Sequence, residues 1–323
     1  MKISEPKWEK INQSFTFWAL VLVVVWGGVP VLAKQGSVYL NGLEMTFWIN
    51  LFALPVVALW ILPKQQRDVV KHYTLGNVLL LIIIGFLGNL FYQVLYFSSY
   101  SSITALTGSV LTRLGNIFFV VASMFFLKEK HSKTNFFAVI LATIGAVLSA
   151  LKPGARLEFS LTVGFWLMII ATFLNTGYNF GNNAVKKKFS NARVNLFIFK
   201  ASTLLVISIW AILSNTLFLS GSSFWQIDFN IPLRDLFTPF ILGAFADGIG
   251  FLAWLKLLEL GDSVKATIVS AIVAVAQVFL AVLIFREDAS WVNAGLAPLL
   301  VIGPTVWAGI MDAKSKKRDL QNL

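Results

Sequence analysis

Ten apolar stretches, each long enough to form a membrane-spanning helix, recur along the chain. A helix needs about 20 mostly apolar residues to cross the hydrocarbon core of a bilayer. Only 13% of the residues are charged, against about 25% in an ordinary soluble domain. We therefore expect an all-α integral membrane protein with ten transmembrane helices, at residues 15–33, 44–62, 75–97, 103–127, 135–151, 163–184, 194–219, 236–258, 265–285 and 292–311.

The basic residues alternate between the predicted loops and indicate an orientation. With the N-terminus in the cytoplasm, 19 of the 26 Lys and Arg residues lie inside, five lie outside, and Arg113 and Lys200 lie within spans. Cytoplasmic loops of membrane proteins are enriched in Lys and Arg. We therefore expect a multi-pass protein of the cell membrane with both termini in the cytoplasm. The first apolar run is longer than a signal-peptide core, so we expect it to remain as a helix.

The two halves of the sequence repeat. At an offset of 158 residues, Glu129 aligns with Glu287 and Asn89 aligns with Asp247. Each half holds five predicted helices, and because five is odd, the second copy must cross the membrane in the opposite direction. Inverted repeats are one organisation of secondary transporters, with the substrate site near the midplane. The predicted units are a first repeat at 1–151, a second repeat at 163–311 and a basic cytoplasmic tail at 312–323.

Four motifs stand out within the first half: Trp26-Gly-Gly, Gly85-x-x-Gly-Asn-Leu-Phe-Tyr-Gln-Val-Leu-Tyr96, Ser101-Ser-Ile-Thr-Ala-Leu-Thr-Gly-Ser-Val-Leu-Thr112 and Leu127-Lys-Glu129. Together they resemble the EamA-type permeases of the drug/metabolite transporter superfamily, and the second half looks like a degraded copy. The resemblance implies a central cavity lined by helices one, three, four, six, eight and nine. It also implies transport of amino acids and related metabolites, with export favoured over import.

One departure from that family concerns two prolines. The family commonly has a proline thirteen residues before the acidic residue that closes helices four and nine. Asn116 and Ala274 occupy these positions here. We therefore do not expect a proline kink in either helix.

Arg113 and Asp247 are the charged residues that most need an explanation. Each lies near the middle of a predicted span, and they come from opposite halves. An arginine at the centre of a bilayer costs about 2.5–3.5 kcal/mol on insertion scales. One interpretation is a buried salt bridge between the halves. In the other, Arg113 binds a carboxylate or phosphate of a substrate, while Asp247 binds an amine or exchanges a proton.

Polar and aromatic side chains at helical spacing extend this candidate site. Asn89 and Tyr92 share one face of helix three, and a similar stripe follows helix six. Single amides in a bundle also serve as hydrogen bonds between helices, so that interpretation stays open for each of them. The predicted substrate-binding residues are Arg113, Asp247, Asn89, Tyr92, Trp26, Asn116, Asn175, Tyr178, Asn179 and Gln277.

Other polar residues receive structural interpretations. Lys200 is close enough to the cytoplasmic end of helix seven for its stem to reach the interface. Tyr96 and Trp254 are expected to anchor helices at the membrane surface. Glu44 is expected at an outer helix end within reach of water.

The composition also constrains the class of function. The chain has no Cys and only two His, so we expect neither a metal site nor a cofactor, and no nucleophile motif indicates an enzyme. The prediction is a secondary transporter of small polar or amphipathic metabolites, with a membrane-embedded enzyme or a non-transporting scaffold as alternatives. Its expected partners are a small-molecule substrate, the lipid bilayer and, through Asp247, protons. We expect no nucleic acid and no obligate protein partner.

Overall fold

The computed structural model describes residues 14–63, 68–69, 73–115, 118, 133–149, 161–186, 191–217, 226–260, 263–286 and 290–321. All regular structure in these ranges is helical, which agrees with the predicted fold class. The elements are α2 (Phe15–Gly27), α3 (Val29–Gly36), α4 (Gly42–Ile61), α6 (Leu75–Gly85), η1 (Phe86–Phe91), α7 (Tyr92–Ser99), α8 (Ala105–Leu111), α10 (Lys133–Ser149), α11 (Val163–Lys186), α12 (Ala192–Leu217), α13 (Phe237–Phe240), η2 (Ile241–Gly250), α14 (Phe251–Leu260), α15 (Ser263–Phe285), η3 (Trp291–Leu296) and α16 (Ala297–Gln321).

These elements follow the predicted apolar stretches closely. Five helical segments are long and apolar enough to cross a membrane by length and composition: Phe15–Gly36, Gly42–Ile61, Leu75–Ser99, Arg193–Ser214 and Phe237–Leu257. The predicted stretch at 103–127 is described only in part, through α8, residues 112–115 and residue 118. The rest of that stretch lies outside the described residues.

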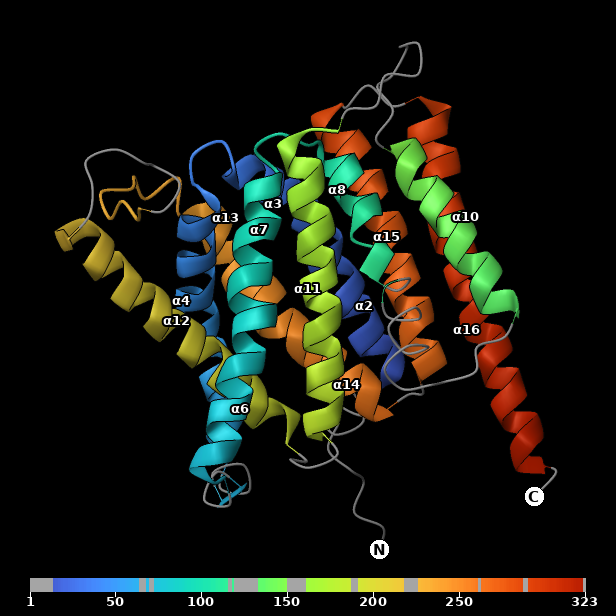
Figure 1. Ribbon diagram of the computed structural model, residues 1–323, viewed down its shortest axis with the longest axis horizontal. Helices are drawn as coiled ribbons and strands as arrows, with labels where there is room; N and C mark the ends of the chain where they lie inside the picture. The colour runs from blue at the N-terminus through green and yellow to red at the C-terminus, as the bar shows by residue number, and fades with distance from the viewer. Residues whose placement is uncertain are drawn as a thin grey trace, which may run out of the picture.

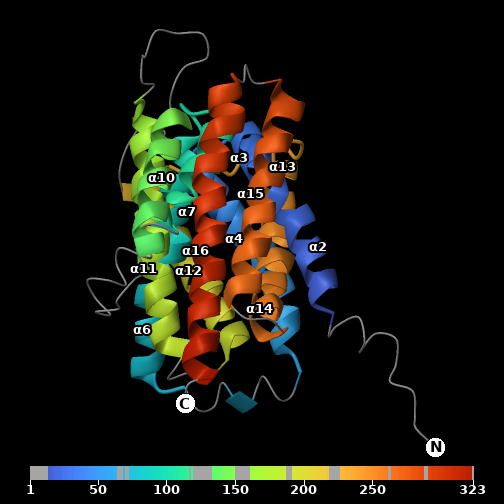
Figure 2. The same cartoon turned by 90° about the vertical axis from the view of Figure 1, so that its right-hand side faces the viewer.

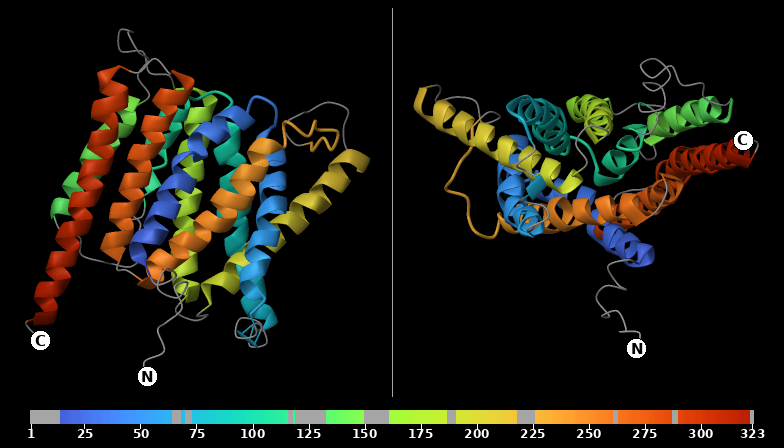
Figure 3. Two further views of the ribbon diagram at one scale, coloured as in Figure 1. Left: turned by 180° about the vertical axis from the view of Figure 1, so that it is seen from behind. Right: turned by 90° about the horizontal axis from the view of Figure 1, so that it is seen from below.

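Successive passes run in opposite directions. The segment α2–α3 runs upward in Figure 1, α4 runs downward and α6–η1–α7 runs upward again. The start of α2 and the end of α16 lie at the same side of the bundle (Figures 1 and 3).

Helices α10 and α16 form a pair at one edge of the bundle, opposite the tilted α12 (Figures 1 and 3). Figure 2 looks onto this edge, where α16 crosses the full height of the bundle. A Cβ atom on Gly145 of α10 would lie 2.7 Å from the carbonyl oxygen of Ala297. The missing side chain therefore lets the two helices approach closely, as small residues do in membrane helix pairs.

Two π-helical segments interrupt the helical runs 75–99 and 237–260 at positions related by the sequence repeat. Residues 86–91 of η1 align at the 158-residue offset with 244–249, which lie inside η2. Asn89 and Asp247 therefore occupy equivalent positions in the two segments. A π-helical turn adds a residue to the turn and is frequent at functional sites.

The segment 226–236, here called the strap, leads into α13 and packs against the start of α4. Glu44 Oε1 accepts the backbone N–H of Asp228 at 3.0 Å, and Glu44 Oε2 accepts that of Asn41 at 2.8 Å. Glu44 is 8% exposed, so the expectation that it reaches water is wrong. Its carboxylate closes the capping box of α4 instead.

Aromatic packing adds to the attachment of the strap. Phe229 lies edge-on to Phe47 of α4, with ring centroids 5.7 Å apart.

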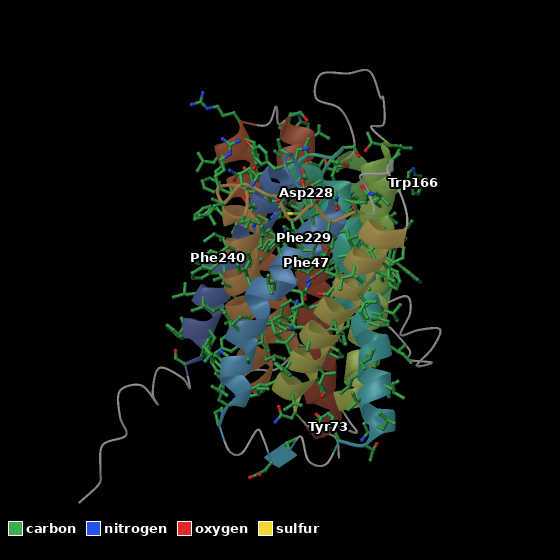
Figure 4. The ribbon with its side chains drawn as sticks, turned by 90° about the vertical axis from the view of Figure 1, so that its left-hand side faces the viewer. Phe47, Tyr73, Trp166, Asp228, Phe229 and Phe240 are labelled. Carbon is green, nitrogen blue, oxygen red and sulfur yellow. The ribbon has the colours of Figure 1, made fainter. Side chains whose placement is uncertain are left out.

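Figure 4 shows Asp228 and Phe229 toward one end of the bundle and Tyr73 at the opposite end. There the Tyr73 hydroxyl donates to Asn195 Oδ1 at 2.8 Å, and burial raises the pKa of this phenol, which keeps it protonated as a donor.

Candidate functional site

A buried ion pair joins α12 to η2. Lys200 is 0% exposed, and its Nζ forms a short salt bridge with Asp247 Oδ2. The same Nζ donates to Asn89 Oδ1 at 3.1 Å and lies 5.4 Å from the ring centroid of Phe251. A lysine ammonium has three donors, so this environment of one anion, one amide oxygen and one ring face leaves it well compensated.

The expectation that Lys200 extends to the membrane interface is wrong. Lys200 is the ninth residue of α12, about 12 Å from its start at 1.5 Å per residue. Its side chain points into the bundle because Asp247 and Asn89 meet there. The sequence did contain a signal for this pairing: Asn89 and Asp247 occupy equivalent positions in the two repeats, deep in their spans. A buried carboxylate needs a cation nearby, and Lys200 is a cation within a neighbouring span.

Amide side chains extend the ion pair across the bundle. Gln93 Nε2 donates to Asp247 Oδ2 at 2.7 Å, and Asn50 Nδ2 donates to Gln93 Oε1 at 2.7 Å. The network thus connects α4, α7, η1, η2 and α12. Two buried atoms in it, Asn89 Nδ2 and Asn50 Oδ1, have no hydrogen-bond partner.

Asp247 is held through one oxygen only. Its Oδ2 accepts hydrogen bonds from both Lys200 and Gln93. Its Oδ1 accepts no hydrogen bond from the residues that the structure describes. The side chain is 14% exposed. One carboxylate oxygen therefore belongs to the buried network and the other is open to a donor.

Arg113 follows α8 directly and reaches across to α15. Its Nη1 donates to Ser270 Oγ at 3.1 Å, and its Nη2 donates to Gln277 Oε1 at 2.9 Å. Its Nε is buried and receives no acceptor from the described part of the chain. Of the two interpretations drawn from the sequence, the direct bridge to Asp247 is wrong here, because Asp247 pairs with Lys200 instead.

Gln277 connects Arg113 to the first helix. Its Nε2 donates to the Trp26 carbonyl at 3.0 Å, and the Trp26 indole N–H donates to the carbonyl of Ala246 at 2.9 Å. Ala246 directly precedes Asp247, so the two polar networks meet at η2. Trp254 stacks on Trp26 with ring centroids 6.0 Å apart, and its expected role as an interfacial anchor stays a prediction.

Tyrosines on α7 lie beside both networks. The charges of Asp247 and Arg113 both act on Tyr92, whose hydroxyl has no hydrogen bond to the described residues. Tyr96 is 5% exposed and accepts a hydrogen bond from the Tyr100 hydroxyl at 3.1 Å. The expectation that Tyr96 is an interfacial anchor is therefore wrong.

Three of the remaining predicted residues, Asn175, Tyr178 and Asn179, belong to α11. Tyr178 packs edge-on against Phe199, with ring centroids 5.4 Å apart, next to η1. Asn175 is half-buried on α11. The side chain of Asn179, and Asn116 as a whole, lie outside the described residues. The structure thus brings together Asn89 and Asp247 around Lys200, and it joins Trp26 and Gln277 to Arg113.

Metal ligands do not gather in this region. Across the described ranges, no group of three His, Cys, Asp or Glu side chains is placed to hold a metal ion. The site can therefore act through hydrogen bonds and charge. It offers the open carboxylate oxygen of Asp247, the guanidinium of Arg113 with its neutral partners, and the Tyr92 hydroxyl, which has no hydrogen bond to the described residues.

Comparisons with known proteins bear on both fold and class. Residues 13–151 match the EamA-like transporter family, and no curated protein sequence matches the chain significantly. A solved structure, titled only as the crystal structure of a protein, superimposes with a TM-score of 0.62 over 93% of this chain and 98% of its own. Its sequence identity is 16%, so this likeness concerns the fold alone.

Proposed function

We propose that this chain, which carries an EamA-like transporter domain over residues 13–151, is a secondary transporter of small polar or amphipathic metabolites. Membership of that domain in a transporter family makes the chain a multi-pass membrane protein. The observation that carries the proposal is the meeting of two polar networks at η2, deep among apolar helices. Ionisable groups inside a membrane bundle are costly, and they commonly mark a substrate or ion pathway.

The proposed mechanism is alternating access between two inverted five-helix halves, at residues 1–151 and 163–311, around this midplane site. Support comes from the opposite directions of successive described helices, with the start of α2 and the end of α16 at one side of the bundle (Figures 1 and 3). The equivalent positions of η1 and η2 in the two halves also support it. In this proposal, rocking of one half against the other opens the site to each side in turn.

Each site residue has a proposed role. Arg113 and Tyr92 present donors to the substrate, and Asp247 presents its open oxygen. Trp26 and Gln277 hold Arg113 and η2 in position, and Asn89 orients Lys200. The proposed contacts from helices four and six are Asn116, Asn175, Tyr178 and Asn179.

Orientation, direction and coupling complete the proposal. The distribution of Lys and Arg favours cytoplasmic termini, with the 312–323 tail inside. The family resemblance favours export, with amino acids among the first solutes to test. Asp247 is the proposed site for a coupling proton, because its open oxygen can accept one.

The test is transport by the purified full-length chain in liposomes. A panel of radiolabelled amino acids, organic acids and nucleosides is offered with and without a pH gradient, and empty liposomes measure leakage. We expect at least one solute to enter faster than into empty liposomes. A panel in which every solute matches the empty liposomes, with the protein inserted and monodisperse, would contradict the proposed function.

A further inference from the structure

We propose that the site selects substrates carrying a net negative charge, an inference that rests on the proposed transport function. The argument starts from the balance of charge among the described residues at the centre of the bundle. Two cations, Arg113 and Lys200, face one anion, Asp247, so one positive charge is in excess.

The excess charge is located on Arg113. Lys200 and Asp247 neutralise each other in a direct salt bridge. Arg113, in contrast, donates only to neutral acceptors, namely Ser270 and Gln277, and no carboxylate of the described residues acts on it. A guanidinium in a low-dielectric interior interacts far more strongly with an anion than with a neutral oxygen. Its charge therefore favours an anionic ligand over a neutral one.

Donors suited to an anion are available at the same place. Arg113 Nε is buried and has no hydrogen-bond partner among the residues that the structure describes. Tyr92, on which the Arg113 charge acts, has a hydroxyl without a partner among the described residues. A guanidinium with an unused N–H and a nearby phenol together match the acceptor oxygens of a carboxylate or a phosphate.

Lys200 removes the alternative of a zwitterionic substrate with zero net charge. If Asp247 stood alone, it would offer a full negative charge to a substrate amine. With Lys200 bound to its Oδ2, the pair is neutral overall, and the open Oδ1 acts as a hydrogen-bond acceptor rather than as a counter-ion. Acidic amino acids, carboxylates and phosphate monoesters carry a net negative charge and can neutralise the excess positive charge of Arg113. Neutral amino acids and amines cannot.

The experiment measures how solutes protect Arg113 from phenylglyoxal, a reagent that modifies guanidinium groups. The full chain is placed in phosphatidylcholine nanodiscs, and mass spectrometry of peptides follows each arginine. The solutes are inorganic phosphate, succinate and glutamate, compared with glutamine and choline at equal ionic strength. Glutamate and glutamine have similar size and differ in charge. Arg234, whose side chain is 82% exposed, is the control within the same chain.

We expect at least one anion to slow modification of Arg113 by about tenfold at ten times its Kd, following simple mass action. Modification of Arg234 should not change, and glutamine and choline should protect neither arginine. Equal protection by glutamine, no protection by any anion, or an Arg113 that the reagent never reaches would each overturn the inference. Nanodiscs with phosphatidylglycerol separate the sources of an anion: protection by that lipid but by no soluble anion would also overturn it.

Two variants test the charge balance directly. Lys200→Met removes one cation and should abolish the preference for glutamate over glutamine, although Arg113 is still present. Lys200→Met combined with Asp247→Asn returns the excess positive charge and should restore that preference. A preference unchanged in the first variant contradicts the inference; if the variants do not fold, the wild-type result decides. Liposome transport of a neutral solute without anion protection would leave the proposed function standing and refute this inference alone.

Discussion

Lys200 and Asp247 illustrate how much a single buried pair depends on both members. The lysine is fully buried and the carboxylate nearly so, and each is also held by an amide, Asn89 or Gln93. Such a pair contributes little net stability relative to apolar packing, but removing one partner leaves an uncompensated charge. The pair therefore fixes the contact between α12 and η2 more than it stabilises the fold.

Asp247→Asn should lower the free energy of unfolding by about 3–5 kcal/mol, because Lys200 is left buried and unpaired. Lys200→Met should lower the free energy of unfolding by a similar amount, because it leaves the Asp247 carboxylate without its cation. The double variant should lose clearly less than the sum of the two, since it removes both charges. Unfolding in mixed detergent micelles measures all three. Strictly additive losses would show that the two side chains do not interact.

The planar guanidinium of Arg113 donates to two neutral acceptors through separate nitrogens, Nη1 to Ser270 and Nη2 to Gln277. Arg113→Ala should lower transport about tenfold or more, because a hydrogen bond to a charged group contributes about 1.5–3 kcal/mol. Arg113→Lys should recover little, since an ammonium cannot reproduce the fork. Uptake into liposomes is compared at equal amounts of inserted protein. Full transport by Arg113→Ala would remove this residue from the site.

At the scale of elements, the π-helical segments determine which side chains face the bundle. An extra residue in the turn rotates the following helix relative to the preceding one. Asn89 lies in η1, whereas Tyr92 and Gln93 begin α7. A straight α-helix places these residues on one stripe. The π turn lets Asn89 reach Lys200 while Gln93 reaches both Asp247 and Asn50.

Gly88 of η1 lies against the Tyr178 ring of α11, and a Cβ there would overlap the Cβ and ring atoms of that tyrosine. Gly88→Ala should therefore lower the free energy of unfolding by about 1–3 kcal/mol through overpacking. Gly177→Ala, on α11 itself, is the matched control, because a Cβ at Gly177 meets nothing within 4 Å. That control should be neutral or stabilising by up to about 1 kcal/mol. Thermal unfolding of both variants in detergent gives the comparison, and equal losses would contradict the packing argument.

At the scale of the whole molecule, the alternating passes and the basic loops make a joint prediction about orientation. The chain has no native cysteine, so single introduced cysteines report topology without background. In intact cells, a membrane-impermeant maleimide should label Leu233→Cys, since Leu233 in the strap is 85% exposed. Lys130→Cys should react only after the membrane is permeabilised. Labelling of Lys130→Cys from outside would reverse the orientation.

Much of this architecture follows from the sequence alone. The apolar stretches predicted where most of the described helices lie, although α16 ends at Gln321, ten residues beyond the predicted end, and most of the stretch 103–127 lies outside the described residues. The 158-residue repeat placed Asn89 and Asp247 at equivalent positions. A bilayer responds to the linear pattern of apolar residues, so helix number, length and depth can be predicted without tertiary contacts. The depth of Arg113 and Asp247 raised the question of function for the same reason.

The choice of partners was decided by the tertiary structure. Lys200 and Asp247 are 47 residues apart, and Arg113 and Gln277 are 164 residues apart. Their meeting depends on how each helix is rotated about its axis, and packing and the two π turns set that rotation. The sequence therefore determined that charges lie inside the membrane. Only the fold decided that Asp247 is neutralised by Lys200 and that Arg113 is left with neutral partners, because contacts between helices depend on rotation and not on depth.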